Sequence, residues 1–335
     1  MHQFVNELTH GETVEDTYLL SEKHLRANRN GNLYLQAELR DRTGNISSRL
    51  WNATENLYSS IEEGGFVRIK GKVQLFQGSL QMILSQVKAI PSNDVELEDF
   101  LPVSSREVNQ LEHRLKALLF DIADPQLHAL MECFLIDEEL MTRFSSAPAG
   151  IKNHHAYLGG LLEHTVNLLE VADRIVDLYP PVDRDLLLAG IFLHDIGKVS
   201  ELSYERSFQY SEEGQLVGHL IIGVELLNKK VLEAEKLLDE PFDTELLLRL
   251  KHMILSHHGT YEFGSPKLPM TPEAIALHYL DNLDAKIHQF AQQIEEDMNP
   301  SSVWTNYIPS LGRKLYKGTQ NPMSFQELNL PPIES

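Results

Sequence analysis

The sequence has little cysteine, few basic residues for its length and no long apolar run. The single cysteine, Cys133, excludes an internal disulfide and a cysteine-based zinc site, so any metal must be bound by histidines and carboxylates. No apolar run approaches the ~18–20 residues of a membrane span, and the first residues lack the basic and then apolar order of a signal peptide. We therefore expect a cytoplasmic protein with no membrane partner.

The shortage of basic residues is confined to one part of the chain. There are 29 Lys and Arg against 49 Asp and Glu, which gives a formal net charge of -20. This balance disfavours a polyanionic partner, because phosphate binding depends largely on Lys and Arg. Residues 1–90, however, contain ten basic and ten acidic residues, so the whole negative charge lies in residues 91–335. The length of 335 residues also indicates two domains.

Residues 1–92 show the period-two pattern of short strands. Apolar residues alternate with polar ones over residues 33–39, 46–51, 67–73 and 80–90, and turn signals stand at Gly44, at Gly64-Gly65 and at Gln77-Gly78. Several short, evenly spaced strands favour a small five-stranded barrel over a sandwich, which would need more strands. We predict an OB-like nucleic-acid-binding domain.

The rest of the chain is predicted to be all α-helical after a linker. Residues 93–104 are rich in acid and lack an apolar period, which is typical of a linker. Residues 105–300 repeat apolar positions every three or four residues and predict a helical bundle. The expected helices cover residues 108–120, 127–144, 157–179, 184–193, 219–238, 244–255 and 272–294. Residues 301–335 are expected to be a loosely packed tail.

Histidines and aspartates interrupt the apolar faces of these helices. Any one such histidine is more often a core or surface residue than a ligand. Burying a polar group without a partner costs a few kcal/mol, however, and inward side chains of packed helices meet at a common centre. The set therefore predicts a divalent metal site, with either about four ligands to one ion or two ions sharing a carboxylate, and we favour two ions. Its expected members are His164, His194, Asp195, His219, His257 and Asp281.

The order of these residues resembles a known family. His164, the pair His194-Asp195 and Asp281 reproduce the H…HD…D pattern of the HD-domain metal-dependent phosphohydrolases, and His219 and His257 stand where their two-metal members carry further histidines. With the barrel-like N-terminal part and the segments KNHHAYLGGLLEH, DRDLLLAGIFLHDIGK, ILSHHGTYEFGSPKLPM and LHYLDNLDAK, the chain is similar to the YhaM family of 3′→5′ exoribonucleases from about residue 10 to about residue 295.

The resemblance implies a metal-dependent 3′→5′ exonuclease acting on single-stranded RNA, with single-stranded DNA as a second substrate. It also implies manganese, whereas the ligand types alone fit Mn²⁺, Fe²⁺, Ni²⁺ or Zn²⁺ better than Mg²⁺. One alternative is an HD-type nucleotide or cyclic-nucleotide phosphohydrolase, and the lack of a GYP-type motif after the HD core disfavours only its cyclic-dinucleotide branch. A non-catalytic single-strand-binding protein is disfavoured because the ligand set is complete.

The resemblance also suggests roles for individual residues. Asp195 is expected to bridge one ion held by His164, His194 and Asp281 and a second held by His219 and His257. The HDIGK form places Lys198 near the substrate phosphate, although a lysine beyond a helix end also interacts favourably with the helix dipole.

Further candidates lie next to the expected ligands. His258 is a possible third ligand of the second ion, but neighbouring side chains on a helix diverge by ~100°, so only one of His257 and His258 is expected to face inward easily. Asp284, one turn after Asp281, is placed to hold a ligating histidine or a metal-bound water. His154 and His155 are expected to touch substrate or to lie on the surface.

The predicted barrel carries candidate residues for nucleic-acid binding. Arg68, Lys70 and Lys72 alternate along a strand and therefore share one face. A basic groove with stacking aromatic rings binds single strands in OB domains, and the candidate rings are Tyr34, Trp51 and Phe76. A solvated strand face with aromatic residues in the core is the alternative. Apolar edges of the helical part also suggest a homo-oligomer.

Overall fold

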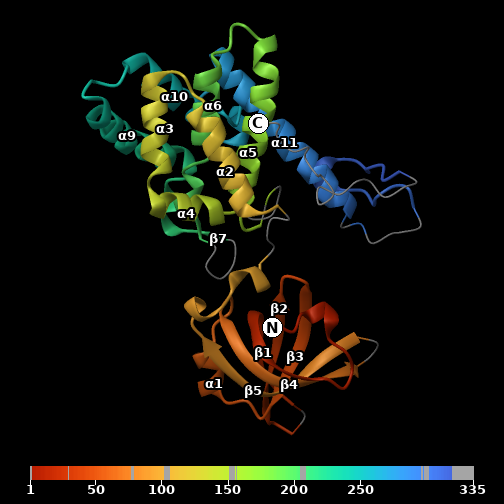
Figure 1. Cartoon of the computed structure of the whole chain (residues 1–335). Coiled ribbons are helices and arrows are strands. Elements are labelled where there is room, and N and C mark those ends of the chain that lie inside the picture. Colours follow the sequence, from red (N-terminus) through yellow and green to blue (C-terminus); the bar gives the residue numbers. More distant parts are fainter. Residues whose placement is uncertain are drawn as a thin grey trace. The chain divides into compact units, whose positions relative to one another are not determined.

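A computed structural model describes residues 2–28, 30–76, 79–101, 106–150, 155, 157–203, 209–295, 297 and 302–318. The chain divides into two compact units, one of Met1–Pro102 with Ser203–Gln209 and one of Val103–Leu202 with Tyr210–Ser335. Figure 1 shows a β-barrel in the first unit and helices in the second. The predicted fold class, an OB-like barrel followed by an all-α HD-type bundle, is confirmed.

The barrel has five strands, as the alternating sequence pattern predicts. They are β1 (Thr13–Ala27), β2 (Leu33–Asp41), β3 (Gly44–Trp51), β4 (Phe66–Phe76) and β5 (Ser79–Ile90). Their order is β1-β2-β3-β5-β4, and pairing of β1 with β4 closes the barrel. All pairs are antiparallel except β3 with β5. Helix α1 (Glu55–Ser60), which the sequence analysis did not predict, connects β3 to β4.

Alternation along each strand sends apolar side chains into the barrel. In β2, for example, Leu35, Ala37 and Leu39 are buried, while Gln36 and Glu38 between them are partly exposed. Short 3-10 helices η1 (Val5–Glu7), η2 (Ser92–Asp94) and η3 (Leu97–Asp99) flank the barrel. Phe100 packs against Leu19 and Phe66, so the segment predicted as a linker begins as structure packed on the barrel.

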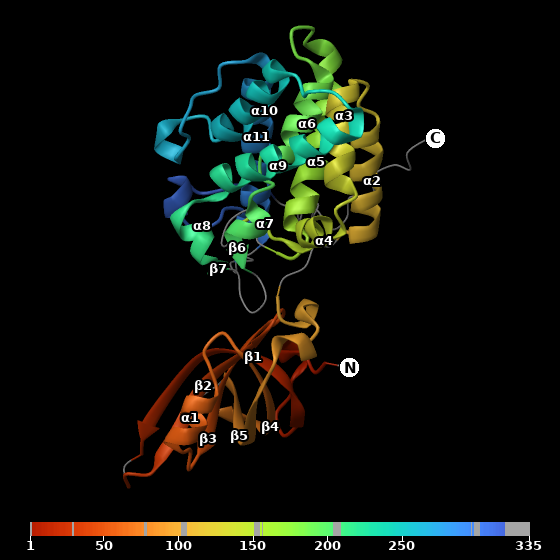
Figure 2. The same ribbon diagram turned by 90° about the vertical axis from the view of Figure 1, so that its left-hand side faces the viewer.

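The helical unit contains α2 (Val108–Phe120), α3 (Pro125–Leu135), α4 (Glu138–Ser146), α5 (Gly160–Ile175), η4 (Val176–Leu178), α6 (Arg184–Leu193), α7 (Lys198–Glu201), α8 (Glu212–Leu216), α9 (His219–Leu238), α10 (Thr244–Ser256) and α11 (Pro272–Glu295). Figure 2 shows their packing. Strands β6 (Leu202–Ser203) and β7 (Gln209–Tyr210) form a small sheet. The helix expected over residues 127–144 is two helices, because Asp137 accepts a hydrogen bond from the Leu140 amide and starts α4.

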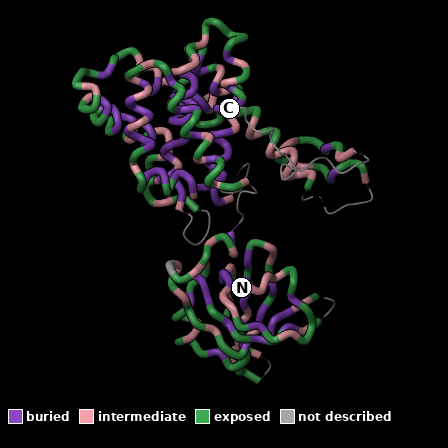
Figure 3. Tube along the Cα trace, in the orientation of Figure 1, coloured by how far each residue is buried: buried purple, intermediate pink, exposed green. Residues whose placement is uncertain are grey.

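Helix α6 is the central element of this unit. Every residue from Leu186 to Leu193 is buried, and α5, α10 and α11 pack around the helix. Figure 3 shows the buried residues gathered at the centre of the helices. A helix that is apolar on all sides must lie in the interior. The pair His194-Asp195 directly follows α6 and is therefore carried into the core.

Residues 302–318 form a small structure beyond α11. Isolated β-bridges join Trp304 to Tyr316 and Ile308 to Arg313, and η6 (Pro309–Leu311) lies between them. These residues belong to the segment predicted as a loose tail. None of the helices in the described part of the chain combines the length and the hydropathy needed to cross a membrane.

Candidate metal centre

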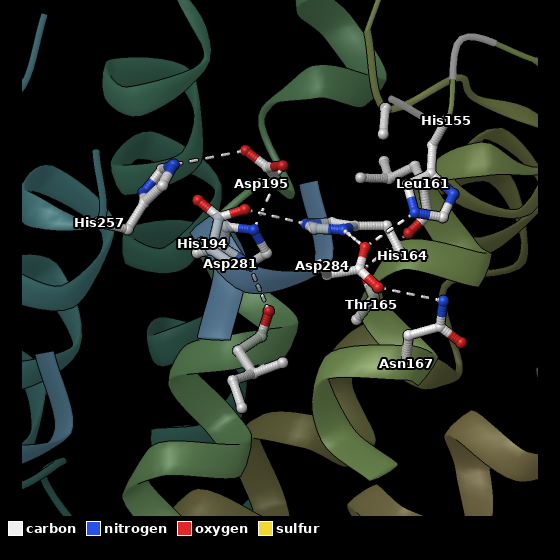
Figure 4. A network of polar contacts seen from close by, with 12 residues as sticks. His155, Leu161, His164, Thr165, Asn167, His194, Asp195, His257, Asp281 and Asp284 are labelled. Carbon is white, nitrogen blue, oxygen red and sulfur yellow. Dashed lines mark hydrogen bonds and ion pairs between the residues drawn. The ribbon is translucent and has the colours of Figure 1, made fainter. Parts of the chain in front are cut away.

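The six predicted ligands meet at one place in the helical unit. His164 lies on α5, His219 is the first residue of α9 and Asp281 lies on α11. The other three directly follow α6 or α10. The rings of neighbouring histidines are close, with centroids 5.5 Å apart for His164 and His194 and 4.8 Å apart for His194 and His257. Figure 4 shows five of these side chains, those of His164, His194, Asp195, His257 and Asp281, directed toward one another.

Asp195 lies between the histidines and is only 3% exposed. Its Oδ2 atom is 3.2 Å from Nε2 of His194, and its Oδ1 atom is 3.6 Å from Nε2 of both His219 and His257. The two carboxylate oxygens therefore face different imidazoles, which is the arrangement that a carboxylate shared between two cations requires.

The backbone fixes two of the imidazoles. Nδ1 of His194 is 2.6 Å from the Ile191 carbonyl oxygen, and Nδ1 of His257 is 2.8 Å from that of Ile254. A carbonyl oxygen only accepts hydrogen bonds, so Nδ1 carries the proton in both rings. The lone pair on Nε2 then points to the centre, which is the tautomer that binds a metal.

Carboxylates hold two more imidazoles in the same way. Nδ1 of His164 is 2.7 Å from Oδ2 of Asp284, and Nδ1 of His219 is 2.9 Å from Oε1 of Glu201. The Glu201 oxygen also accepts the backbone N–H of His219 at 3.0 Å. Such outer partners orient the ring and raise its basicity as a ligand.

Several polar atoms at this centre have no hydrogen-bond partner. Within the described residues, these buried atoms include Nε2 of His194, Nε2 of His219, Nδ1 of His258 and Oδ1 of Asp195. Each such atom costs ~1–3 kcal/mol when it is left unsatisfied. They face one another, so a divalent cation would satisfy them together, and the residues present fit a divalent metal.

The charges at the centre favour an ionised carboxylate. Burial raises the pKa of Asp195, but the charge of Lys198 and the contact with His194 outweigh this effect and hold the pKa well below its ordinary value. Burial lowers the pKa of His257, so this ring is neutral and able to bind a cation. Burial also opposes a charge on His164, but hydrogen bonds to Asp281 and Asp284 raise its pKa to about 10.

Lys198 contacts the central carboxylate. Its Nζ atom is 2.7 Å from Oδ2 of Asp195 and 2.7 Å from the Ala149 carbonyl oxygen. Lys198 is the first residue of α7, where a cation interacts unfavourably with the helix dipole. The dipole therefore does not explain this lysine, and its position beside Asp195 remains compatible with the predicted contact to phosphate.

His258 faces the centre together with His257, so the expectation that only one of them would do so is wrong. Helix α10 ends at Ser256, and the angular spacing of helical side chains does not apply beyond that point. The ring of His258 lies 4.4 Å from that of His257 and 5.2 Å from that of His219. Possible ligand atoms of the three histidines lie within 4.8 Å of one another.

Asp284 accepts hydrogen bonds on the far side of His164, where it was predicted to act. Its Oδ2 atom is also 2.8 Å from Nε2 of His155, whose Nδ1 atom is 2.7 Å from the Tyr157 hydroxyl. His155 is 2% exposed, so the surface position considered for it is wrong. His154 lies outside the described residues.

Neither the role of Glu201 nor the need for glycine at position 197 was predicted from the sequence. A Cβ atom on Gly197 would lie 2.0 Å from the backbone carbonyl oxygen of His219, so only glycine allows α9 to begin at this point. Glu201 is separated from His219 by 18 residues and lies on a helix that was not predicted. The HDIGK pattern contains a signal for the glycine, but no periodicity marks the glutamate.

Comparisons with known proteins agree with this geometry. Residues 161–286 match the HD domain, and residues 20–90 match an OB-fold nucleic acid binding domain. The 3′-5′ exoribonuclease YhaM of Bacillus subtilis (strain 168) is 35% identical over 310 residues, which cover 92% of this chain and 96% of that protein. Its counterpart in Bacillus velezensis is 36% identical, with the same coverage.

The chain belongs to the YhaM family of 3′-5′ exoribonucleases.

One solved structure is similar over a small part of the chain. The second OB-fold domain of replication protein A from Methanococcus maripaludis is 21% identical over 27% of this chain and 95% of its own, with a TM-score of 0.21.

A cavity of about 280 Å³ opens beside the metal centre of this YhaM-family chain. Asp195, Lys198 and Asp281 line it at the metal centre, and several side chains extend the lining away from the expected ligands. These additional residues are Phe263, His278, Asn282, Ala285, Lys286 and Gln289. Phe263 is 71% exposed, which leaves its ring accessible to a ligand. The lining offers amide, cationic and aromatic groups next to the carboxylate.

The residues predicted to bind nucleic acid occupy two parts of the barrel surface. Arg68, Lys70 and Lys72 are exposed on one face of β4, as predicted, and Lys70 forms an ion pair of 2.9 Å with Glu15. Strand β5 separates β4 from β3, which carries Trp51. The basic residues therefore do not lie on a strand next to this ring.

The aromatic candidates lie on the outer surface rather than in the core. Tyr34 and Trp51 are cross-strand partners with ring centroids 5.2 Å apart, and Trp51 is 45% exposed. The Phe76 ring lies 5.7 Å from the guanidinium of Arg49. Arg49 on β3 is paired with Ile83 on β5, and Ile83 is in turn paired with Lys72 on β4. One of the three β4 cations therefore lies near this aromatic region.

Proposed function

We propose that this chain hydrolyses the 3′-terminal phosphodiester of single-stranded RNA and releases nucleotides, with single-stranded DNA as a second substrate. The observation that carries the proposal is the meeting of imidazoles from four separate segments around the carboxylate of Asp195, with the Nε2 atoms of three of them 3.2–3.6 Å from its oxygens. The named activity of the YhaM relatives supports the direction of degradation.

The proposed site holds two divalent cations, with manganese favoured. Asp195 would be shared, and the groups on its two sides would hold one ion each. The first group is His164, His194 and Asp281, and the second is His219, His257 and His258. When bound, such ions supply an activated water molecule and neutralise charge on the reacting phosphate.

The protein residues of the cavity would position the substrate. The Nζ atom of Lys198 would bind a non-bridging phosphate oxygen and stabilise the charge that develops on it. The Phe263 ring offers a stacking surface for the terminal base. Lys286 lies five residues after Asp281 on α11, ~7.5 Å further along the helix axis, where it would contact a neighbouring phosphate of the strand.

The barrel would hold the strand as other OB domains do. Its partly exposed rings at Tyr34 and Trp51 provide stacking surfaces, and Arg49, Arg68 and Lys72 provide positive charge. An RNA substrate agrees with the cytoplasmic location expected from the sequence.

We further propose that the chain forms a homo-oligomer through α11. Ile275, Tyr279, Leu283 and Ile287 recur every four residues and are 40–64% exposed. Residues at this spacing share one face of a helix, and a second copy of the chain would bury that face. Sedimentation velocity should therefore show a species larger than 38.2 kDa, and Tyr279→Glu should shift it toward the monomer. A wild-type monomer at micromolar concentration would contradict this part of the proposal.

Digestion of end-labelled RNA tests the proposed activity. A 5′-labelled strand should shorten gradually, whereas a 3′-labelled strand should lose its label at once as a mononucleotide. Asp195→Ala should abolish both results without loss of the helical circular dichroism signal. Hydrolysis of free nucleotides or cyclic nucleotides, with no degradation of RNA, would favour the alternative HD-type phosphohydrolase.

A further inference from the structure

We propose that residues 303–317 form a second contact site for single-stranded RNA, separate from the metal centre and from the barrel. This inference rests on the proposed RNA substrate and goes beyond it, because neither the HD match nor the OB-fold match includes this segment. The segment combines a stable backbone arrangement, exposed aromatic rings and a local excess of positive charge.

The backbone of the segment folds back on itself. The Thr305 amide donates to the Leu315 carbonyl oxygen at 2.9 Å, and the Lys317 amide donates to that of Val303 at 2.8 Å. The Thr305 hydroxyl oxygen also accepts the Leu315 amide, and both side chains are buried. Gly312, with a φ of 63°, occupies the left-handed conformation at the turn.

The segment is also tied to the end of α11. The carboxylate of Asp297, two residues beyond the helix, accepts the Asn306 amide at 3.0 Å and lies 3.4 Å from Nζ of Lys317. The arrangement is therefore attached to the helical unit, and its outer side chains have defined positions.

Aromatic rings occupy the outer face of this structure. Trp304 and Tyr316 are paired across the β-bridge with ring centroids 5.0 Å apart, and they are 48% and 57% exposed. Tyr307 is 59% exposed. Because Thr305 and Leu315 take the buried side, the adjacent ring residues face outward. Large rings held rigidly at the surface are typical of a binding site.

The positive charge of the segment favours a polyanionic ligand. Residues 302–318 contain Arg313, Lys314 and Lys317 and no acidic residue, whereas residues 91–335 as a whole carry the net charge of -20. Lys317 interacts with Asp297, and both Arg313 and Lys314 are exposed. Stacking rings beside cations bind single-stranded nucleic acid without a strong sequence preference, because every base has a π-face and every nucleotide a phosphate.

The barrel offers an internal comparison. There, Tyr34 and Trp51 form a cross-strand ring pair at 5.2 Å, and Arg26 is the neighbour of Tyr34 on β1. The pair Trp304 and Tyr316 repeats this combination of half-exposed rings and nearby cations in the other unit. We infer that the two surfaces bind the same kind of ligand.

A binding measurement on the full-length, metal-loaded protein tests this inference. The probe is a 5′-fluorescein RNA longer than the ~4–16 nucleotides that one OB fold covers, with phosphorothioate linkages at its 3′ end to slow hydrolysis. Fluorescence anisotropy gives Kd at several salt concentrations. The variants are Trp304→Ala with Tyr316→Ala, and Arg313→Ala with Lys314→Ala. Matched controls are Tyr179→Ala and Lys236→Ala, which alter an exposed ring and a lysine elsewhere.

The two test variants should respond differently. Loss of the rings should raise Kd about tenfold or more, since stacking on one base is worth ~1–3 kcal/mol. Loss of the two cations should also reduce the slope of log Kd against log salt by up to ~1.4. Hydrolysis of a trinucleotide, which is too short to span separate sites, should stay at the wild-type rate in both variants. The controls should change neither quantity.

Three results would overturn the inference. The first is an unchanged Kd for long RNA in both variants. The second is a loss of trinucleotide hydrolysis as large as the loss of RNA affinity, which would show damage to the metal centre instead. The third is a change in oligomeric mass without a change in RNA affinity, which would identify a protein interface. Retained trinucleotide hydrolysis would leave the proposed nuclease function intact in the first and third cases.

Discussion

Replacing Glu201 should weaken metal binding although this residue is not itself an expected ligand. Its Oε1 atom holds both the Nδ1 and the backbone N–H of His219, at 2.9 and 3.0 Å. Glu201→Ala removes both hydrogen bonds and leaves the imidazole free to turn away from Asp195. Loss of such an outer partner typically costs ~10–100-fold in metal affinity, or ~1.4–2.7 kcal/mol. Glu201→Gln keeps an accepting oxygen and should lose less than the alanine variant.

The assay measures bound manganese by mass spectrometry and activity on RNA across a range of manganese concentrations. In Glu201→Ala, the second ion should be lost first, so the metal content at limiting manganese should fall toward one ion per chain. The manganese concentration for half-maximal activity should rise ~10–100-fold. Glu213→Gln, at an exposed glutamate on α8, is the matched control and should behave as wild type. Unchanged metal content and activity in Glu201→Ala would refute the assigned role.

Three further predictions concern other parts of the site. Gly197→Ala should displace His219 and lower manganese-dependent RNA hydrolysis at least tenfold, since the added Cβ meets a backbone carbonyl at 2.0 Å; full activity would contradict the packing argument. Lys286→Gln should raise KM for a trinucleotide but not for a dinucleotide, which has a single phosphodiester; equal effects on both would remove the predicted second phosphate contact. Burial raises the pKa of Glu273, but hydrogen bonds from a backbone amide and Arg249 hold it below the ordinary 4.5. This contribution to stability is present above pH 4.5 and is lost as the pH falls through the lower pKa of the folded state, so Glu273→Gln should cost ~1.5–3 kcal/mol in chemical denaturation at pH 7 and progressively less as the pH is lowered below 4.5.

Helices with an unbroken apolar period were predictable to the residue. The predicted ranges 108–120, 184–193 and 219–238 coincide with α2, α6 and α9, because each carries a continuous apolar face. The prediction of a single helix over residues 127–144 was wrong because Asp137 starts a new helix without interrupting the apolar pattern. The break between the two helices therefore depends on the capping residue, and hydrophobic periodicity alone does not predict it.

The convergence of the candidate ligands could be predicted from the sequence, but the residues that orient them could not. The six expected ligands meet because each lies on or next to a strongly apolar helix that had to enter the core. The inward position of His258 depends on where α10 ends, and the contact of Glu201 with His219 depends on how two short elements pack. Neither feature follows from a pattern along the chain.

The barrel shows a similar limit. The strands could be predicted from the alternation of apolar and polar residues. Their order around the barrel, however, depends on the parallel pairing of β3 with β5, which no local sequence pattern indicates. For this reason, the sequence suggested one groove containing Arg68, Lys70, Lys72 and the aromatic rings. The structure instead places the ring pair of Tyr34 and Trp51 on β2 and β3, separated from β4 by β5.

Crystals grown with manganese would test the central claim most directly, because anomalous diffraction locates manganese without assumptions about the ligands. We expect two peaks ~3.5–4 Å apart on either side of the Asp195 carboxylate, each within bonding distance of imidazole Nε2 atoms. A single peak in this cluster, or manganese bound only elsewhere in the chain, would contradict it.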